Sequence, residues 1–203
     1  MSFSGPEAAA ALWTAVAAAV AGAPGRAPVV LIDGPSGAGK SSLADFVVAG
    51  WPFDGEPRLV RMDDLYPGWG GLDAASDALG RELLAPLRVA GHGRWRRWDW
   101  AEDRPAEWHA VHGIRPLVVE GCGTLAGANA ANADLRLWLD ADDALRKRRA
   151  LARDGLAFEA HWDQWQHEFE EYVEREHPRD NADLVLDVTE WPLSVRRSSP
   201  VEG

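Results

Sequence analysis

The sequence predicts an α/β fold in three layers, with a mostly parallel five-stranded sheet flanked by helices. Short apolar runs alternate with helical patterns along the chain. Most of these runs are continuously apolar, as expected for strands that helices cover on both faces. The chain has 203 residues, of which 46% are hydrophobic and 26% charged, and this is enough for one substantial core. We therefore expect a single domain over residues 1–193.

Five apolar runs are the predicted strands. They are Val29–Asp33, Arg58–Met62, Leu117–Glu120, Leu135–Leu139 and Leu184–Val188. The helical patterns between them are Lys40–Ala49, Asp73–Val89, Asp142–Arg153 and Phe158–Glu176. Strands that alternate with helices favour parallel pairing through right-handed crossovers, so a ligand is expected at the carboxyl ends of the strands.

Three segments lie outside this alternation. An alanine-rich run predicts a helix over about residues 6–22, begun by Pro6 and ended by Gly22. This run is shorter than the ~20 apolar residues that a membrane span needs, and it lacks the basic start of an export signal. The stretch Gly91–Pro116 has no clear period and indicates an irregular excursion over the functional edge. Residues 194–203 are polar, and we expect a disordered tail.

Composition narrows the classes of partner. The formal charge of −11 repels nucleic acid and anionic membranes at long range, so we expect a small-molecule substrate, no nucleic acid and no membrane. The single cysteine, Cys122, cannot form an internal disulfide, which fits a reducing compartment and a cytoplasmic protein. Cys122 is interpreted as a small buried hydrophobic residue, with a reactive thiol as the alternative.

The stretch VVLIDGPSGAGKSSLADF contains the pattern G-x-x-x-x-G-K-[ST] between an apolar strand and a helix. Its glycines let successive backbone amides and the helix N-terminus point at a phosphate. Lys40 is expected to reach the β- and γ-phosphates, and the Ser41 hydroxyl to reach Mg²⁺. The motif predicts the P-loop NTPase fold with ATP and Mg²⁺ as cofactors. The predicted nucleotide-binding residues are Gly34, Pro35, Ser36, Gly37, Ala38, Gly39, Lys40, Ser41 and Ser42.

Acidic residues end two further strands. Asp63 and Asp64 follow the second apolar run, on a strand expected next to the phosphate loop, where a carboxylate can take a proton from a hydroxyl or hold Mg²⁺. The alternative is an ordinary turn or cap aspartate. Glu120 ends the third run and can polarise a water on the metal, or it can simply face solvent.

An arginine-rich helix is the predicted lid, over about residues 142–156. Arg146, Arg149 and Arg153 recur at three- and four-residue spacing near one face. Such cations can neutralise the charge that develops on a transferred phosphoryl group, and we expect Arg149 and Arg153 to be catalytic. The alternative is a solvated basic face that pairs with neighbouring acids.

The stretch GRWRRWDWAEDR interleaves arginines with tryptophans. It could stack a base and hold an anion, bind single-stranded nucleic acid, or pack as ordinary structure. The acidic chain disfavours nucleic acid. We therefore expect Arg97 and Arg104 to contact a small substrate.

The order of GPSGAGKS, MDDLYPGW, WDW, VVEG, the arginine-rich segment and NADLVLDV, over residues 28–188, resembles the uridine kinase and phosphoribulokinase group of P-loop kinases. The resemblance implies that Asp63 is the base for the acceptor hydroxyl and that Tyr66 lines the acceptor pocket. It also places Asp99 against the acceptor and Glu120 near the metal. Uridine kinases carry a base-reading histidine where this chain has a segment around the acidic Asp103, which argues against uridine itself.

Together these observations predict ATP- and Mg²⁺-dependent phosphoryl transfer to a hydroxyl of a nucleoside or similar metabolite. Lys40, Asp63, Arg149 and Arg153 are the predicted catalytic residues, and Ser41, Asp63 and Glu120 the predicted metal site. One alternative is a nucleoside monophosphate kinase of the cytidylate type, in which Arg94, Arg96 and Arg97 hold the acceptor phosphate. Another is a nucleotide-binding regulatory protein without an acceptor. The acceptor and the oligomeric state stay open.

Overall fold

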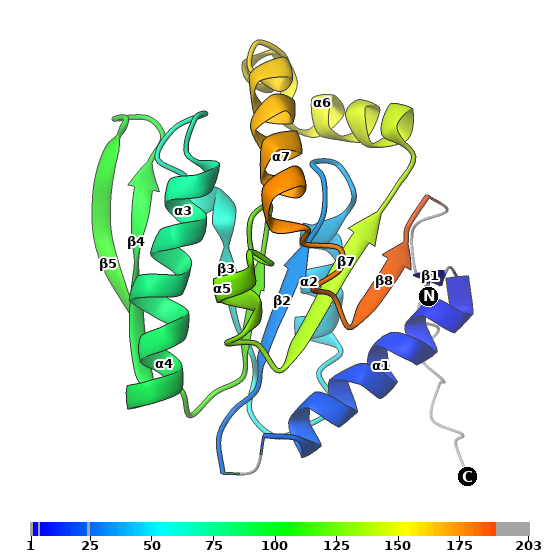
Figure 1. Cartoon of the computed structure of the whole chain (residues 1–203), viewed down its shortest axis with the longest axis vertical. Coiled ribbons are helices and arrows are strands. Elements are labelled where there is room, and N and C mark those ends of the chain that lie inside the picture. Colours follow the sequence, from blue (N-terminus) through cyan, green and yellow to red (C-terminus); the bar gives the residue numbers. More distant parts are fainter. Residues whose placement is uncertain (1, 4, 24, 190–203) are drawn as a thin grey trace, which may run out of the picture.

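All five predicted strands pair in parallel in one sheet of the computed structural model, which describes residues 2–3, 5–23 and 25–189 (Figure 1). The order across the sheet is β3-β6-β2-β7-β8, with the two-residue strand β1 added beyond β8. Their bounds are β1 Ser2–Phe3, β2 Val29–Asp33, β3 Arg58–Arg61, β6 Leu117–Glu120, β7 Leu135–Asp140 and β8 Leu184–Asp187. The predicted five-stranded parallel sheet is confirmed, and β1 is an addition to it.

Helices cover both faces of the sheet, which explains why the strands are continuously apolar. They are α1 Gly5–Ala21, α2 Lys40–Ala49, α3 Leu72–Ala78, α4 Ala85–Ala90, α5 Gly127–Ala130, α6 Asp143–Glu159 and α7 Trp162–Glu176. Along β2, Val30 and Ile32 pack in a core with α1 and α2. Val29 and Leu31 point the other way, into a core with α3, α4 and α7. The three predicted layers are therefore present.

Two helix boundaries differ from the prediction. The helix expected over Asp73–Val89 runs over Leu72–Ala90 as α3, a π-helical segment η2 (Leu79–Leu84) and α4. Phe158 was expected to start the last helix, but it lies in α6, and α7 begins at Trp162. The backbone break is at Gly155, where φ is 66° and ψ −153°, so the chain bends inside α6 before its last residues.

The irregular excursion expected over Gly91–Pro116 is mostly an antiparallel hairpin, so that prediction was wrong. It consists of β4 (His92–Asp99) and β5 (Arg104–His112). The register shifts between Arg96 and Trp98, which breaks the alternation that identifies a strand in sequence. The hairpin stands beside α3 and α4 at the left of Figure 1.

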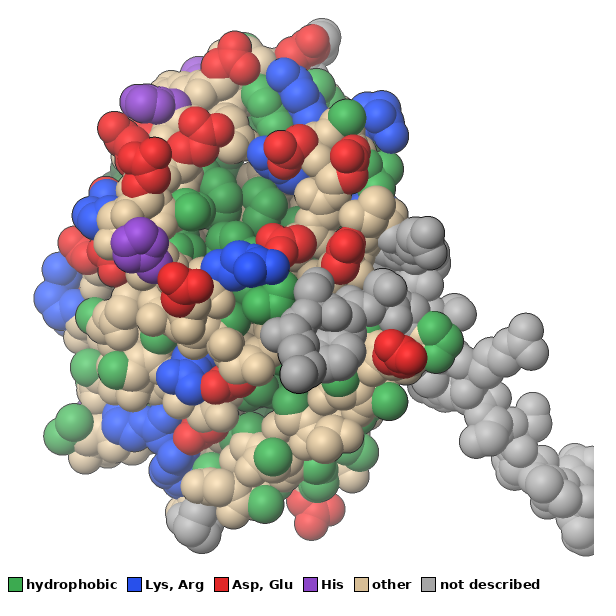
Figure 2. All heavy atoms as spheres, turned by 45° about the vertical axis from the view of Figure 1, so that its right-hand side comes forward, with side chains coloured by type: hydrophobic (Ala, Val, Ile, Leu, Met, Phe, Trp, Pro, Cys, Tyr) green, Lys and Arg blue, Asp and Glu red, His purple; other side chains and the backbone are tan. Residues whose placement is uncertain are grey.

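The carboxyl ends of the strands carry the functional edge. In Figure 1, α6 and the start of α7 lie over this edge, at the top of the view. Figure 2 shows a hollow in the upper half of one face, with hydrophobic side chains in its depth and charges of both signs around it. No helix in the described part of the chain is long and apolar enough to cross a membrane. The predicted tail, residues 194–203, lies outside the described residues.

Candidate active site

The phosphate loop connects β2 to α2, as the motif predicted. The ammonium group of Lys40 is buried and donates to the carbonyl oxygens of Gly34 at 2.7 Å and Pro35 at 3.0 Å, and it lies 3.4 Å from the Cys122 sulfur. The carbonyl groups of the loop thereby hold the ammonium group of its own lysine against the loop. Cys122 is buried, as interpreted, and burial raises the pKa of its thiol.

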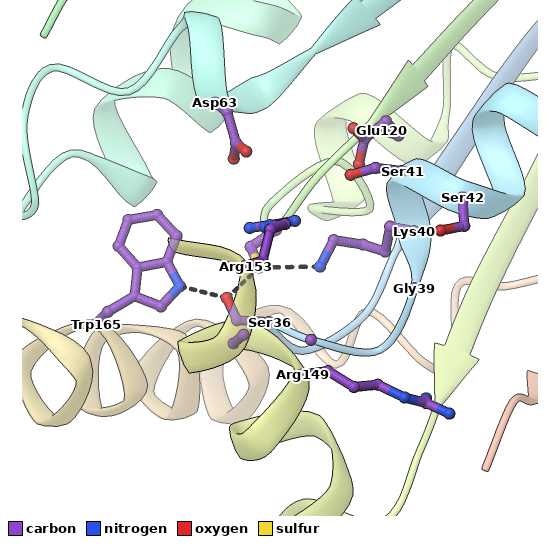
Figure 3. Close-up of a pocket in the computed structure, with 13 residues that line it drawn as sticks. Ser36, Gly39, Lys40, Ser41, Ser42, Asp63, Glu120, Arg149, Arg153 and Trp165 are labelled. Atoms are coloured by element: carbon purple, nitrogen blue, oxygen red, sulfur yellow. Dashed lines mark hydrogen bonds between the residues drawn. The ribbon is translucent and has the colours of Figure 1, made fainter. Parts of the chain in front are cut away.

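A pocket opens over this loop, and all of the predicted catalytic and metal residues line it (Figure 3). From the loop and the start of α2 it is lined by Ser36, Gly37, Gly39, Lys40, Ser41 and Ser42. From other elements it is lined by Asp63, Glu120, Cys122, Arg149, Ala150, Arg153 and Trp165. Gly34, Pro35 and Ala38, also predicted to bind nucleotide, shape the loop but do not line the pocket. We call this the phosphate pocket.

Glu120 lies at the carboxyl end of β6 and does not face solvent, contrary to the alternative considered from sequence. Its side chain is 3% exposed and accepts a hydrogen bond from Arg61 at 2.9 Å. Burial raises the pKa of Glu120, while Lys40, Arg61 and Ser41 oppose the increase. The carboxylate is therefore held between cations at the floor of the phosphate pocket.

Asp63 lies in the 3₁₀ turn η1 (Met62–Asp64) after β3. β3 pairs with β6 and not with β2, so one strand separates Asp63 from the strand that leads into the loop. The Asp63 side chain nevertheless lines the phosphate pocket. Ser41, Asp63 and Glu120 offer the hard oxygen atoms that Mg²⁺ prefers, with room for water as the remaining ligands. The predicted metal residues thus fit this ion.

The arginines of α6 have different environments. Arg149 lines the phosphate pocket and donates to the backbone oxygens of Val188 and Thr189, each at 3.3 Å. Arg153 is exposed and lines the same pocket. Arg146 is buried instead, bonded at 2.8 Å to Asp143 and to Gln166. The alternative of pairing with neighbouring acids therefore describes Arg146, whereas Arg149 and Arg153 line the phosphate pocket.

A second, aromatic pocket adjoins the phosphate pocket. Its lining is Ser36, Asp63, Tyr66, Trp69, Trp100, Arg153, Phe158 and Trp165. Four of these residues, Ser36, Asp63, Arg153 and Trp165, line both pockets. The two pockets therefore share a wall, and Asp63 is part of this wall.

The aromatic walls are held by specific contacts. The Tyr66 hydroxyl donates to the Cys122 carbonyl at 2.8 Å, and burial raises its pKa well above the ordinary value. Trp69 stacks on Phe158 with ring centres 5.5 Å apart. The Trp100 indole donates to the Asp63 backbone oxygen at 2.8 Å, which fixes the hairpin to the turn that carries Asp63. The pocket is a preformed apolar slot beside a carboxylate.

The predicted substrate residues of the hairpin do not line either pocket. Arg97 bonds to Glu107 at 2.7 Å and lies 3.5 Å from Asp99, and it lines a separate pocket between the hairpin and α3. Asp99 accepts the backbone N–H groups of Ala101 and Glu102. Arg104 is exposed. Tyr66 therefore lines the aromatic pocket, whereas Arg97, Asp99 and Arg104 lie on the hairpin, outside both pockets.

Asp33, at the end of β2, was not singled out from sequence. It is fully buried and accepts from the backbone of Gly34 at 2.7 Å, the backbone of Leu125 at 2.8 Å and the Tyr172 hydroxyl at 2.7 Å. Burial raises its pKa, and these donors oppose the increase. Asp33 therefore joins the loop, the turn after β6 and α7. An acid directly before the first glycine of the motif was the available signal.

Trp165, in α7, was also missed. It is 5% exposed and donates from its indole nitrogen to the Ser36 hydroxyl at 2.9 Å (Figure 3). In sequence it appears only as one apolar residue at helical spacing, and such residues are usually core. Its contact with the phosphate loop depends on how α7 is placed.

Solved structures of other proteins match the fold of this chain. One is a possible uridine kinase from Bacillus stearothermophilus, 19% identical, with a TM-score of 0.55 over 79% of this chain and 89% of that one. The chain has the fold of a uridine kinase-like P-loop kinase. A candidate fructose transport system kinase from Silicibacter sp. TM1040, 17% identical, matches this fold with a TM-score of 0.52 over 90% of this chain and 98% of that one. No family model matches the sequence.

Proposed function

We propose that this P-loop protein is an ATP- and Mg²⁺-dependent kinase that phosphorylates a hydroxyl of a small molecule, with nucleosides as the favoured class. The observation that carries the proposal is the position of Asp63 in the wall between the phosphate pocket and the aromatic pocket. An acceptor in the aromatic pocket would present its hydroxyl to this carboxylate, next to the γ-phosphate. Both substrates would then meet at one side chain, as transfer requires.

Each residue has a role in this proposal. The loop amides and Lys40 hold the β- and γ-phosphates. Ser41, Asp63 and Glu120 would hold Mg²⁺, which supplies positive charge to the phosphate oxygens when bound. Asp63 orients the acceptor hydroxyl and takes its proton. Arg149 and Arg153 line the phosphate pocket, and there they would stabilise the charge that develops during transfer.

The shape of the aromatic pocket supports a planar acceptor. Tyr66, Trp69, Trp100, Phe158 and Trp165 supply ring surfaces on which a base can stack. A reading as uridine kinase proper has less support, because the residue found near the corresponding family histidine is Asp103. The pocket shape therefore supports a class of acceptor, the nucleosides, rather than one individual nucleoside.

The monophosphate kinase alternative has less support. Its three acceptor-phosphate arginines are engaged in other contacts: Arg94 with Glu82 of η2 and with Trp108, Arg96 with the Ala106 carbonyl, and Arg97 with Glu107. These contacts would have to break before the arginines could bind an acceptor phosphate. A regulatory protein without an acceptor would leave the aromatic pocket beside Asp63 without a purpose.

The test is ADP formation with ATP·Mg²⁺ and a panel of uridine, cytidine, adenosine, uridine monophosphate, ribose and fructose. Asp63→Asn keeps the shape of the side chain but removes its basicity. We expect ATP binding, titrated without Mg²⁺, to stay close to wild type and acceptor-stimulated turnover to be lower by about 10²–10⁴.

Asp64→Asn is the matched control, because Asp64 lies in the same turn but lines neither pocket. Its turnover should stay near that of the wild type. Acceptor-stimulated turnover retained in Asp63→Asn would exclude Asp63 as the base. A wild-type protein that no acceptor stimulates would favour the regulatory alternative.

A further inference from the structure

The contact between Trp165 and Ser36 connects the two pockets. Ser36 is the third residue of the phosphate loop, and Trp165 lies on α7, 129 residues further along the chain. The indole nitrogen of Trp165 donates to the Ser36 hydroxyl oxygen at 2.9 Å. The ring also packs edge-on against Tyr66, with ring centres 4.8 Å apart. Figure 3 shows the indole nitrogen pointing at the Ser36 hydroxyl.

The chemistry of the two groups decides which is the donor and which the acceptor in this hydrogen bond. An indole N–H can only donate, so the Ser36 oxygen must be the acceptor. The hydroxyl hydrogen of Ser36 then remains to be donated elsewhere. Within the described part of the chain, this hydroxyl also lies 3.7 Å from the Cys122 sulfur. Thiol sulfur is a weak acceptor, so an incoming phosphate oxygen would be a better partner.

We infer that Trp165 is a positioning residue for phosphoryl transfer: it orients the Ser36 hydroxyl so that this group donates to the transferred phosphoryl group. The inference rests on the proposed kinase function. A donor oriented before the reaction stabilises developing charge without the cost of reorienting it during the reaction. Because Trp165 is also a wall of the aromatic pocket, a bound acceptor packs on the same ring that orients Ser36.

The surroundings of Trp165 make this orientation stable. The side chain is 5% exposed. On the next turns of α7, Phe169 and Tyr172 are buried as well, and the Tyr172 hydroxyl bonds to Asp33 at 2.7 Å. The helix therefore contacts the phosphate loop segment at two points, Ser36 and Asp33. Trp165 can keep its hydrogen bond only while α7 stays against this segment.

The test compares Trp165→Phe, Ser36→Ala and the double variant with Trp162→Phe as the matched control. Phenylalanine keeps the ring contact with Tyr66 but removes the donor. Trp162 lies on the same helix, is similarly buried at 6%, and lines neither pocket. The assay is ADP formation with ATP·Mg²⁺ and the most effective acceptor of the panel, together with titration of a non-hydrolysable ATP analogue.

We expect kcat to fall about tenfold or more in Trp165→Phe and in Ser36→Ala, which is the usual size for one hydrogen bond to a charged group. The affinity for the ATP analogue should stay within about twofold, because the bond serves the transferring group. The double variant should be no slower than either single variant, since one contact is removed in all three. Ser36→Thr keeps the hydroxyl and should restore most of the rate.

Three outcomes would overturn the inference: Trp165→Phe as active as Trp162→Phe, independent losses that multiply in the double variant, or a loss that appears only in ATP affinity. Failure of the proposed function is a separate result, because it shows in the wild type as the absence of acceptor stimulation. In that case the same four variants are compared in basal ATP hydrolysis. The same order of rates is expected there, because the hydroxyl acts on the phosphoryl group and not on the acceptor.

Discussion

Replacing Gly37 by alanine should separate α6 from the phosphate loop. Gly37 has a φ of 79°, and a Cβ added there would overlap the backbone carbonyl of Arg146, in α6. Gly39, two residues later, has a φ of 92° but open space around the corresponding Cβ position. The pair therefore separates two costs: Gly39→Ala measures backbone strain alone, and Gly37→Ala measures strain together with the collision with α6.

The expected magnitudes differ. A positive φ costs an alanine about 1–2 kcal/mol in either position. Backbone atoms cannot rotate away from an overlap as a flexible side chain can, so the helix or the loop must shift, at about 1–3 kcal/mol more. We expect about 2–5 kcal/mol of lost unfolding free energy for Gly37→Ala. For a chain of this size 1 kcal/mol lowers Tm by about 2–4 °C.

Urea unfolding without nucleotide measures this difference, because no ligand then contributes to stability. Amide hydrogen exchange along α6 provides the second readout, since a displaced helix should lose protection before the rest of the chain. If Gly37→Ala lowers the unfolding free energy no more than Gly39→Ala does, and the amides of α6 keep their protection, then α6 does not pack against the loop at Gly37.

Three further predictions concern the site. Lys40→Ala should weaken binding of ATP, followed by titration, and abolish turnover, because the loop loses the side-chain cation that faces the β- and γ-phosphates; full turnover in a folded variant would remove the loop from the mechanism. Arg153→Ala should lower kcat more than it raises the KM for ATP, whereas Arg148→Ala, exposed on the same helix, should leave both unchanged; equal effects would reduce α6 to a solvated basic face. The pKa of Glu120 is raised by burial above its ordinary 4.5, so the folded state binds its proton more tightly, and the stability linked to that proton is present below pH 4.5 and lost as pH rises through the folded pKa. Glu120→Gln should therefore gain stability relative to wild type as the pH rises above 4.5 in urea unfolding; a loss of stability in the variant over the same range would mean that the Arg61 ion pair outweighs burial.

Local signals in the sequence were sufficient for the sheet and for the phosphate loop. A strand covered on both faces must be apolar at every position, so β2 and β6 were recognisable without knowing their neighbours. The loop motif likewise places its own Lys40 and Ser41, because all its parts lie within one turn between a strand and a helix. Asp63 and Glu120 followed from a general property of parallel sheets, whose strand ends meet at one edge.

The hairpin shows where local signals were insufficient. Arginine and tryptophan occur on both faces of β4 and β5, and the shift after Arg96 breaks the alternation. The sequence placed Asp99 near the acceptor by resemblance, and Arg97 and Arg104 by the interleaving of arginine with tryptophan. In the structure Arg97 pairs with Glu107, Asp99 accepts backbone N–H groups of the loop that joins the two strands, and Arg104 is exposed. Whether such a group faces a pocket depends on the docking of the hairpin, which no local pattern specifies.

The sequence by itself determined the layered parallel sheet, the phosphate loop and the carboxylates at the strand ends, because each of these depends on residues close together in the chain. Only the tertiary structure decided which distant side chains complete the site. Trp165 and Tyr172 meet Ser36 and Asp33 across more than 120 residues, and Arg146 turns into the core while Arg149 and Arg153 face the pocket. These contacts depend on how α6 and α7 pack over the sheet edge, and that packing is settled by the burial of the whole core rather than by any one segment.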